Sequence, residues 1–232
     1  MFLFSLNFMN VRLLFCLFLF VFNLELTFAD KENLSDFEFK IAFGSCGKQT
    51  HTLPIFNEVI KQNPNLFIFL GDNIYGDTND MDILRKKYQE LGNKESYKNL
   101  IENTEVLATW DDHDYGQNDA GKHYPHKEES KEIFLGFFKE PKNSERYKHQ
   151  GIYHSVYKEA GNKIIQIILL DNRTFRDDLV RFPKGQKIPG RFFYRPDYLP
   201  HADDSKAFLG KEQWSWLEGE LKKKADLRII AS

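Results

Sequence analysis

Short apolar runs alternate with polar, glycine-containing turns along most of the chain. Residues 67–70 are apolar and run directly into Gly71 and an acidic turn, which predicts a strand buried on both faces. Residues 38–43 predict an earlier strand, and apolar positions at helical spacing predict a helix over residues 54–61. Strand, loop, helix, turn and strand form a βαβ unit with parallel strands. We therefore expect the loops that follow its two strands to face one another.

The rest of the chain predicts further helices and strands, and so an α/β fold class. Helices are predicted over 81–91, 95–102, 128–139 and 209–224, and strands over 106–110, 152–157, 163–170 and 226–231. The last helix would place Trp214, Leu217 and Leu221 on one face. Residues 177–208 lack periodicity and predict a long surface loop. Because Ser232 falls inside a predicted strand, we expect a domain that is incomplete at its C-terminus.

The N-terminal segment has the pattern of an export signal. Arg12 gives a positive flank, residues 13–21 are an unbroken apolar run, and Thr27-Phe28-Ala29 ends the segment with a small residue. The apolar run is shorter than a membrane-spanning helix requires. We expect residues 1–29 to be a signal peptide and residues 30–232 to be the mature domain. The protein would then be secreted or periplasmic, without a stable membrane anchor.

Charge and cysteine content narrow the choice of partners. The net charge is −2, with 32 basic and 34 acidic residues, so no nucleic-acid partner is expected. Removal of residues 1–29 would leave Cys46 as the only cysteine, which cannot form an internal disulfide. Its thiol remains a candidate metal ligand, a reactive group or a buried apolar side chain.

Polar side chains follow four of the predicted strands. They are Cys46; Asp72, Asn73 and Tyr75; Asp111, Asp112, His113 and Asn118; and Asp171 and Arg173. Strand ends of an open α/β sheet meet at one edge, where such folds bind ligands. Carboxylates that converge there repel one another, and a polyvalent cation is the simplest way to stabilise them. The alternative is that these are ordinary turn residues. Of the two neighbouring carboxylates, Asp112 is expected to be the ligand and Asp111 its support.

The candidate ligands favour a particular metal chemistry. Thiolate, phenolate, carboxylate and amide groups do not make a structural zinc site, and they fit ferric iron beside a harder divalent ion. Two metals bridged by Asp72 would generate a hydroxide nucleophile and clamp a phosphate ester. His113 would protonate the leaving oxygen or bind transition-state oxygens, and Arg173 would hold a non-bridging phosphate oxygen.

Four motifs carry a resemblance to a known family. They are Gly44-Ser45-Cys46, Gly71-Asp72-Asn73-Ile74-Tyr75-Gly76-Asp77, Thr109-Trp110-Asp111-Asp112-His113-Asp114-Tyr115-Gly116 and Leu170-Asp171-Asn172-Arg173. In this order they resemble the PhoD-like alkaline phosphatases of the metallophosphoesterase superfamily, over about residues 39–232. The resemblance implies a double β-sheet sandwich flanked by helices, a metal centre of iron and calcium type, and hydrolysis of phosphate esters.

Carried over by position, the resemblance also implies roles for single residues. Cys46, Asp72 and Tyr75 would be metal ligands, Asp112 and Asn118 would lie at the second metal, His113 would be catalytic, and Arg173 is a further candidate. The family takes additional ligands from a C-terminal portion that has no counterpart in residues 1–232.

Three functions follow as hypotheses. The first is an exported, metal-dependent phosphatase or phosphodiesterase that acts on small-molecule phosphate esters. The second is a secreted, non-catalytic binding protein that keeps the phosphatase fold. The third is a nucleotide-directed hydrolase of the same superfamily.

Overall fold

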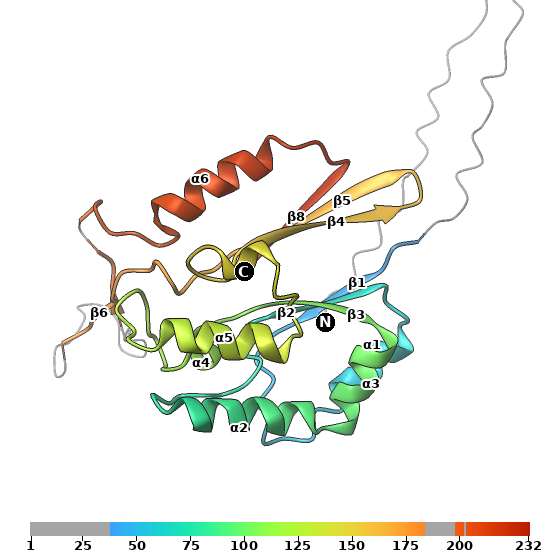
Figure 1. Cartoon of the computed structure of the whole chain (residues 1–232), viewed down its shortest axis with the longest axis horizontal. Coiled ribbons are helices and arrows are strands. Elements are labelled where there is room, and N and C mark those ends of the chain that lie inside the picture. Colours follow the sequence, from blue (N-terminus) through green and yellow to red (C-terminus); the bar gives the residue numbers. More distant parts are fainter. Residues whose placement is uncertain (1–37, 184–197, 202) are drawn as a thin grey trace, which may run out of the picture. The chain divides into compact units, whose positions relative to one another are not determined.

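A computed structural model describes residues 38–183, 198–201 and 203–232 (Figure 1). The predicted signal peptide, residues 1–29, and the middle of the predicted loop, residues 184–197, lie outside the described residues. In the part of the chain that is described, no helix has the length and apolar character needed to cross a membrane.

The first sheet contains three parallel strands in the order β1-β2-β3. These strands are β1 (Ile41–Gly44), β2 (Leu66–Leu70) and β3 (Glu105–Thr109). Helix α1 (Ile55–Lys61) joins β1 to β2, and helices α2 (Met81–Gly92) and α3 (Glu95–Asn103) lie between β2 and β3. The predicted βαβ unit is therefore confirmed, and its strands end at the same edge of the sheet.

The second sheet is mixed and has the order β4-β5-β8. The predicted hairpin is β4 (His154–Ala160) with β5 (Lys163–Leu169), and β8 (Leu227–Ala231) pairs in parallel with β5. Helix α6 (Gly210–Leu221) precedes β8. The remaining elements are α4 (Asp112–Tyr115), α5 (Lys127–Phe137), the 3-10 turn η1 (Glu145–Tyr147), and the short strands β6 (Val180–Arg181) and β7 (Tyr198–Leu199).

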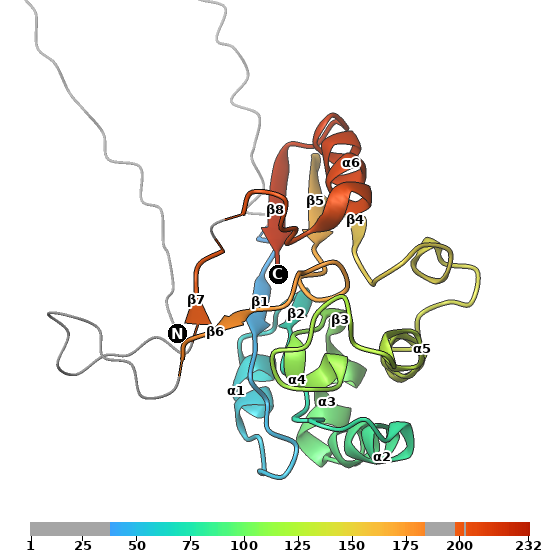
Figure 2. The same ribbon diagram turned by 90° about the vertical axis from the view of Figure 1, so that its left-hand side faces the viewer.

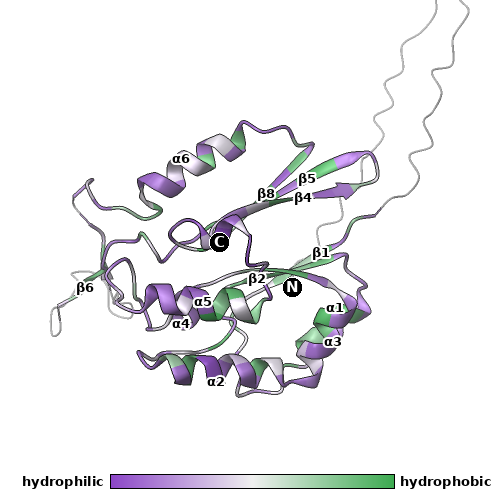
Figure 3. Ribbon diagram, viewed as in Figure 1, coloured by the Kyte–Doolittle hydropathy of each residue, from purple (hydrophilic) through white to green (hydrophobic). Residues whose placement is uncertain are grey.

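The two sheets pack face to face between helices, as Figures 1 and 2 show. Side chains of a strand alternate between its two faces. In β2, Phe67 and Phe69 belong to the core under the helices, while Leu66 and Ile68 belong to the core between the sheets. The strands of the first sheet are largely hydrophobic, whereas the helices carry both hydrophilic and hydrophobic residues (Figure 3). The expected α/β sandwich flanked by helices is confirmed.

The predicted apolar face of α6 was wrong. Trp214 is 51% exposed and Leu221 is 41% exposed, whereas the buried positions of the helix are Gln213, Leu217 and Glu220. The two buried polar residues have hydrogen-bond partners, as burial of polar groups requires. Gln213 donates to the backbone oxygen of Asp171 at 2.8 Å, and Glu220 accepts from Gln166 at 2.9 Å.

Two loop predictions also need correction. Residues 177–208 are not wholly irregular, because β6 and β7 pair as an antiparallel ribbon. In the acidic segment after β3, residues Asp112–Tyr115 form one helical turn, α4, rather than an open loop.

Candidate metal centre

The loops after β1 and β2 are hydrogen-bonded to one another. The Cys46 N–H donates to the Gly71 oxygen at 3.2 Å, and the Gly47 N–H donates to the Asp72 oxygen at 2.9 Å. Cys46 has φ 61° and Asp72 has φ 50°, torsions that few residues other than glycine adopt. These turns bring the Cys46 sulfur to 3.6 Å from Oδ2 of Asp72. The two side chains are neighbours, as the βαβ unit predicts.

Gly71 lets the loop after β2 approach the loop after β3. Its φ is 104°, and a Cβ added there would lie 2.6 Å from the backbone nitrogen of Asp111. Only glycine avoids both the strained torsion and the clash. The backbone before Asp72 is therefore packed directly against the backbone before Asp112.

Gln49 holds the backbone of Tyr75, in the loop after β2, through two hydrogen bonds. The Tyr75 N–H donates to Oε1 of Gln49 at 2.8 Å, and Nε2 of Gln49 donates to the Tyr75 oxygen at 3.4 Å. The Tyr75 ring lies against the His113 imidazole, with ring centroids 4.2 Å apart. Burial, followed by the proximity of Cys46 and Asp72, raises the pKa of Tyr75 to about 12. A cation that binds this hydroxyl as phenolate must therefore be a strong Lewis acid.

Asp114 connects the loop after β2 to the start of α4 through hydrogen bonds. It is fully buried and accepts hydrogen bonds from the Asn73 N–H at 3.0 Å, from Nδ2 of Asn73 at 2.5 Å and from the Asp111 N–H at 2.6 Å. These bonds fix the spacing between the Asp72 and Asp112 side chains, since each lies next to a bonded residue.

Arg173 is held against the acidic turn by Asp111. Its Nε and Nη2 both donate to Oδ1 of Asp111, and Nη2 also lies 3.7 Å from Oδ1 of Asp112. Its Nη1 is buried and has no hydrogen-bond partner among the described residues. Asp111 therefore holds the Arg173 guanidinium in place, and Nη1 is the nitrogen of Arg173 that remains to donate to a ligand.

Asp112 is surrounded by donors that favour its ionised form. Its Oδ2 accepts the Asp119 N–H at 2.7 Å. Burial alone would raise the pKa of Asp112, but this hydrogen bond and the charges of Arg173 and His113 hold the pKa below its usual value.

His113 pairs with Asp77 through Nδ1, at 2.7 Å. Burial acts to lower the pKa of His113, yet the hydrogen bond and charge of Asp77 outweigh it and raise the pKa. Because Nδ1 is occupied, Nε2 is the nitrogen left for a substrate or a metal.

Asp72, Asp112 and His113 form a group whose ligand atoms are close enough together to hold a cation. Oxygens of Asp72 and Asp112 and a ring nitrogen of His113 lie within 4.8 Å of one another. Oδ1 of Asp72 is buried without a hydrogen-bond partner among the described residues, which is costly for a carboxylate. Burial and the charge of Asp111 raise the pKa of Asp72, although His113 acts against this. A bound cation would satisfy the free oxygen and relieve the repulsion.

Comparisons with known proteins agree with this geometry. The sequence model of the family "PhoD-like phosphatase" matches residues 41–232. The chain belongs to the PhoD-like phosphatase family.

Solved structures support the same fold. Six chains match, among them one described as "Structure of PhoD", with a TM-score of 0.59 and 20% sequence identity. The match covers 83% of this PhoD-like chain and 41% of the solved one. At this identity the likeness shows the fold alone. No curated protein matches the chain.

Two residues predicted for the PhoD-like site, Asp171 and Asn118, differ in their burial and contacts. Asp171 is fully buried and accepts hydrogen bonds from the backbone N–H groups of Ile152, Arg173 and Thr174, so its carboxylate shapes the loop after β5. Asn118 is exposed and follows α4, where its Nδ2 donates to Asp119.

Four residues of the site were not assigned roles from the sequence. They are Gln49, Asp77, Asp114 and Asp119. Asp77 and Asp114 are the last acidic residues of the second and third PhoD-like motifs, so the motifs contained a signal for them. Gln49 and Asp119 stand outside those motifs, and only the folded chain brings them to the site.

Proposed function

We propose that this chain is the metal-binding part of a phosphoric ester hydrolase, an alkaline phosphatase or phosphodiesterase that acts on small-molecule phosphate esters. The observation that carries this proposal is the carboxylate of Asp72, which lies close to Asp112 and His113 and has one buried oxygen without a hydrogen-bond partner among the described residues of a PhoD-like chain. A buried carboxylate oxygen in this state is suited to binding a cation.

Ferric iron would be held by Cys46, Asp72 and Tyr75, and a divalent ion, Ca²⁺, by Asp72, Asp112 and Asn118. The softer thiolate and the phenolate suit ferric iron, whereas carboxylate and amide oxygens suit Ca²⁺. When bound, such a metal pair supplies an activated water and positive charge for in-line displacement at phosphorus.

The side chains around the metals would do the remaining chemistry. The Asp77 carboxylate keeps the His113 ring turned so that Nε2 is available, and the raised pKa favours a protonated ring. His113 would then give its proton to the leaving alkoxide. Nη1 of Arg173 would donate to a non-bridging phosphate oxygen while Asp111 holds the rest of the guanidinium.

Hydrolysis of an aryl phosphate ester tests the proposal. The full-length protein, supplied with Fe³⁺ and Ca²⁺, should hydrolyse the ester, and Asp72→Asn should reduce turnover by at least about 10²-fold because a charged ligand is lost. Asp82→Asn is the matched control, since Asp82 is an exposed carboxylate that pairs with Arg85. Unchanged turnover in Asp72→Asn would contradict the mechanism. Metal binding without hydrolysis would favour the alternative of a non-catalytic binding protein.

Ligation of ferric iron by Tyr75 has its own signature. A phenolate bound to ferric iron gives a broad visible charge-transfer band, so the iron-loaded chain should be coloured and Tyr75→Phe should lose the colour. Tyr124→Phe is a suitable control, because its hydroxyl bonds to the Thr78 backbone oxygen instead. A colourless, iron-loaded wild type would exclude Tyr75 as a ligand.

We also infer export of the protein, with residues 1–29 removed and residues 30–232 forming the mature domain. The charged flank, apolar run and small residue at position 29 support this. Mass spectrometry of the protein recovered outside the cytoplasm should find Asp30 at the N-terminus. Recovery of the chain from the cytoplasm with its first 29 residues intact would contradict export.

A further inference from the structure

Asp119 makes contacts through every polar group it has. Its N–H donates to Oδ2 of Asp112 at 2.7 Å, and its backbone oxygen accepts from Nη2 of Arg176. Oδ2 of its carboxylate accepts Nδ2 of Asn118 at 2.7 Å and the hydroxyl of Tyr198. With φ 61°, the residue also holds a left-handed backbone torsion. Asp119 thus contacts two of the three side chains proposed to bind the second metal, Asp112 and Asn118.

The loop around Asp119 is fixed in place by Arg176. The Arg176 guanidinium also donates to the Ala120 oxygen at 3.1 Å, and the Lys122 N–H donates to the Arg176 oxygen at 2.8 Å. A Cβ added at Gly121 would collide with that same oxygen. The backbone position of Asp119 is therefore set by the loop, and the Tyr198 hydroxyl contacts its carboxylate in addition to Asn118.

The carboxylate of Asp119 determines which end of the Asn118 amide faces it. A carboxylate oxygen only accepts hydrogen bonds, so the amide must present its NH₂ group, and its oxygen Oδ1 then points elsewhere. Hard cations bind the oxygen of an amide and never its nitrogen. An amide that was free to turn would present its NH₂ group, instead of Oδ1, to the cation in one of its two flipped orientations.

We propose that Asp119 is a positioning residue for the second metal. It keeps Oδ1 of Asn118 available as a ligand and, through its N–H, fixes the Asp112 carboxylate. This inference rests on the proposed function, because it takes Asn118 and Asp112 as the ligands of the divalent ion. Through Tyr198 and Arg181, whose Nη2 lies 4.0 Å from the Asp119 carboxylate, the ribbon of β6 and β7 is tied to the same residue.

Calorimetric titration of the chain with Ca²⁺ tests the role of Asp119. Asp119→Asn keeps the shape of the side chain but lets the Asn118 amide turn, so Ca²⁺ affinity should fall about 10- to 100-fold. Asp178→Asn is the matched control, because Asp178 is an exposed carboxylate of the neighbouring loop that pairs with His123. The control should bind Ca²⁺ as the wild type does.

The reciprocal swap Asn118→Asp with Asp119→Asn separates positioning from loop stability. In the swap, the amide at position 119 donates to the carboxylate at 118, and either carboxylate oxygen is a suitable ligand while total charge is conserved. Ca²⁺ affinity should return to within about 3-fold of the wild-type value, well inside the loss expected for a missing outer-shell contact. A swap that binds no better than Asp119→Asn would overturn the inference.

The two proposals fail in different ways. Ca²⁺ binding that is unaffected by Asp119→Asn overturns the positioning role while hydrolysis by the wild type stands. If Ca²⁺ affinity is lost in Asp119→Asn and regained in the swap, but the full-length wild type hydrolyses no ester, the positioning role is supported and the hydrolase is contradicted. A wild type that binds no Ca²⁺ overturns the positioning role outright.

Discussion

Asp114 accepts two hydrogen bonds from Asn73, one from the backbone N–H at 3.0 Å and one from Nδ2 at 2.5 Å. A third comes from the Asp111 N–H at 2.6 Å. One buried carboxylate thus joins the loop after β2 to the turn that begins α4. The residues beside these contacts, Asp72 and Asp112, are the central candidates for metal ligands.

Asp114→Asn should destabilise the fold and weaken metal binding together. The introduced NH₂ group would face N–H donors, and each buried donor left without an acceptor costs about 1–3 kcal/mol. Urea unfolding measures the loss, and Ca²⁺ titration measures the second effect. Asp82→Asn, on the exposed face of α2, should change the free energy of unfolding by less than about 0.5 kcal/mol. Equal stability of the two variants would contradict the role given to Asp114.

Gly71→Ala should disrupt the close approach of two loops. The φ of 104° disfavours alanine, and the added Cβ would lie 2.6 Å from the Asp111 nitrogen. We expect a loss of at least about 1–3 kcal/mol in the free energy of unfolding, with lower metal occupancy. Gly136→Ala is the control, because nothing lies within 4 Å of a Cβ there, and an alanine within a helix is favourable. If Gly71→Ala leaves the free energy of unfolding unchanged, the two loops have room to move apart.

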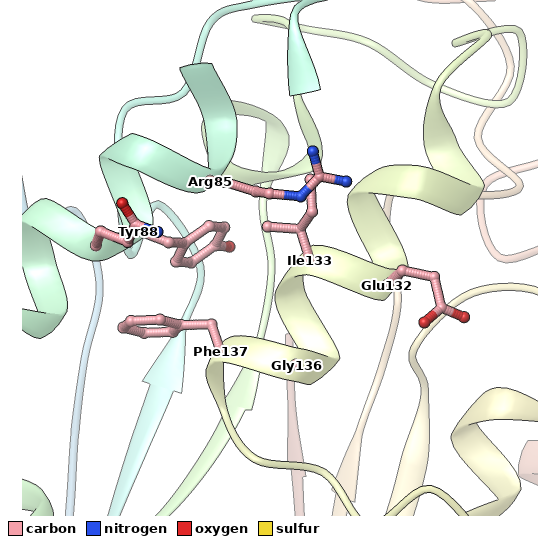
Figure 4. Close-up of a pocket in the computed structure, with 7 residues that line it drawn as sticks. Arg85, Tyr88, Glu132, Ile133, Gly136 and Phe137 are labelled. Carbon is pink, nitrogen blue, oxygen red and sulfur yellow. The ribbon is translucent and has the colours of Figure 1, made fainter. Parts of the chain in front are cut away.

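Tyr88→Phe should leave the fold unchanged or stabilise it. Tyr88 lies in a groove between α2 and α5, where its ring packs against Phe137 with centroids 4.7 Å apart (Figure 4). Its hydroxyl is buried and has no partner among the described residues, so its removal should raise stability by up to about 1–3 kcal/mol. Tyr124→Phe, which loses a hydrogen bond to the Thr78 oxygen, should instead be destabilised. Similar losses in both variants would reveal a partner for Tyr88.

His154 should contribute to acid sensitivity. Burial, followed by the charges of Arg146 and His149, lowers its pKa to about 3 in the folded state. The unfolded chain binds this proton near pH 6.5 and the folded chain does not, so the free energy of unfolding falls as pH drops from about 6.5 towards 3. The slope from one such group is at most about 1.4 kcal/mol per pH unit.

His154→Phe should flatten that dependence. Unfolding midpoints measured from pH 7 to 4 should differ less in the variant than in the wild type. His123→Gln, at an exposed imidazole, is the control and should keep the wild-type slope. An unchanged slope in His154→Phe would show that carboxylates alone govern acid unfolding.

The parallel βαβ unit of β1 and β2 at the candidate site could be predicted because the signals were local. A continuous apolar run at residues 67–70 marks a doubly buried strand, and the short helix before it fixes a parallel neighbour. The meeting of Cys46 and Asp72 follows from that topology. Their roles as metal ligands remain predictions.

Other features depend on partners distant in the sequence. Gln213 and Glu220 of α6 are buried because Asp171 and Gln166 bond to them, which no helical periodicity of apolar residues reveals. Likewise, Asp119 accepts a hydrogen bond from the hydroxyl of Tyr198, which lies far along the chain. Pattern analysis detects where apolar surface is buried, and it does not detect polar groups that are buried in pairs.

The left-handed torsions of Cys46 and Asp72 have a consequence for metal exchange. Both are maintained by backbone hydrogen bonds between their loops, and these bonds need no ion. We therefore expect the site to be preorganised, unlike small zinc domains that fold only around their metal. Chelation should yield a folded apoprotein that recovers its metals on dialysis. Metal supply would then regulate this chain reversibly, without refolding.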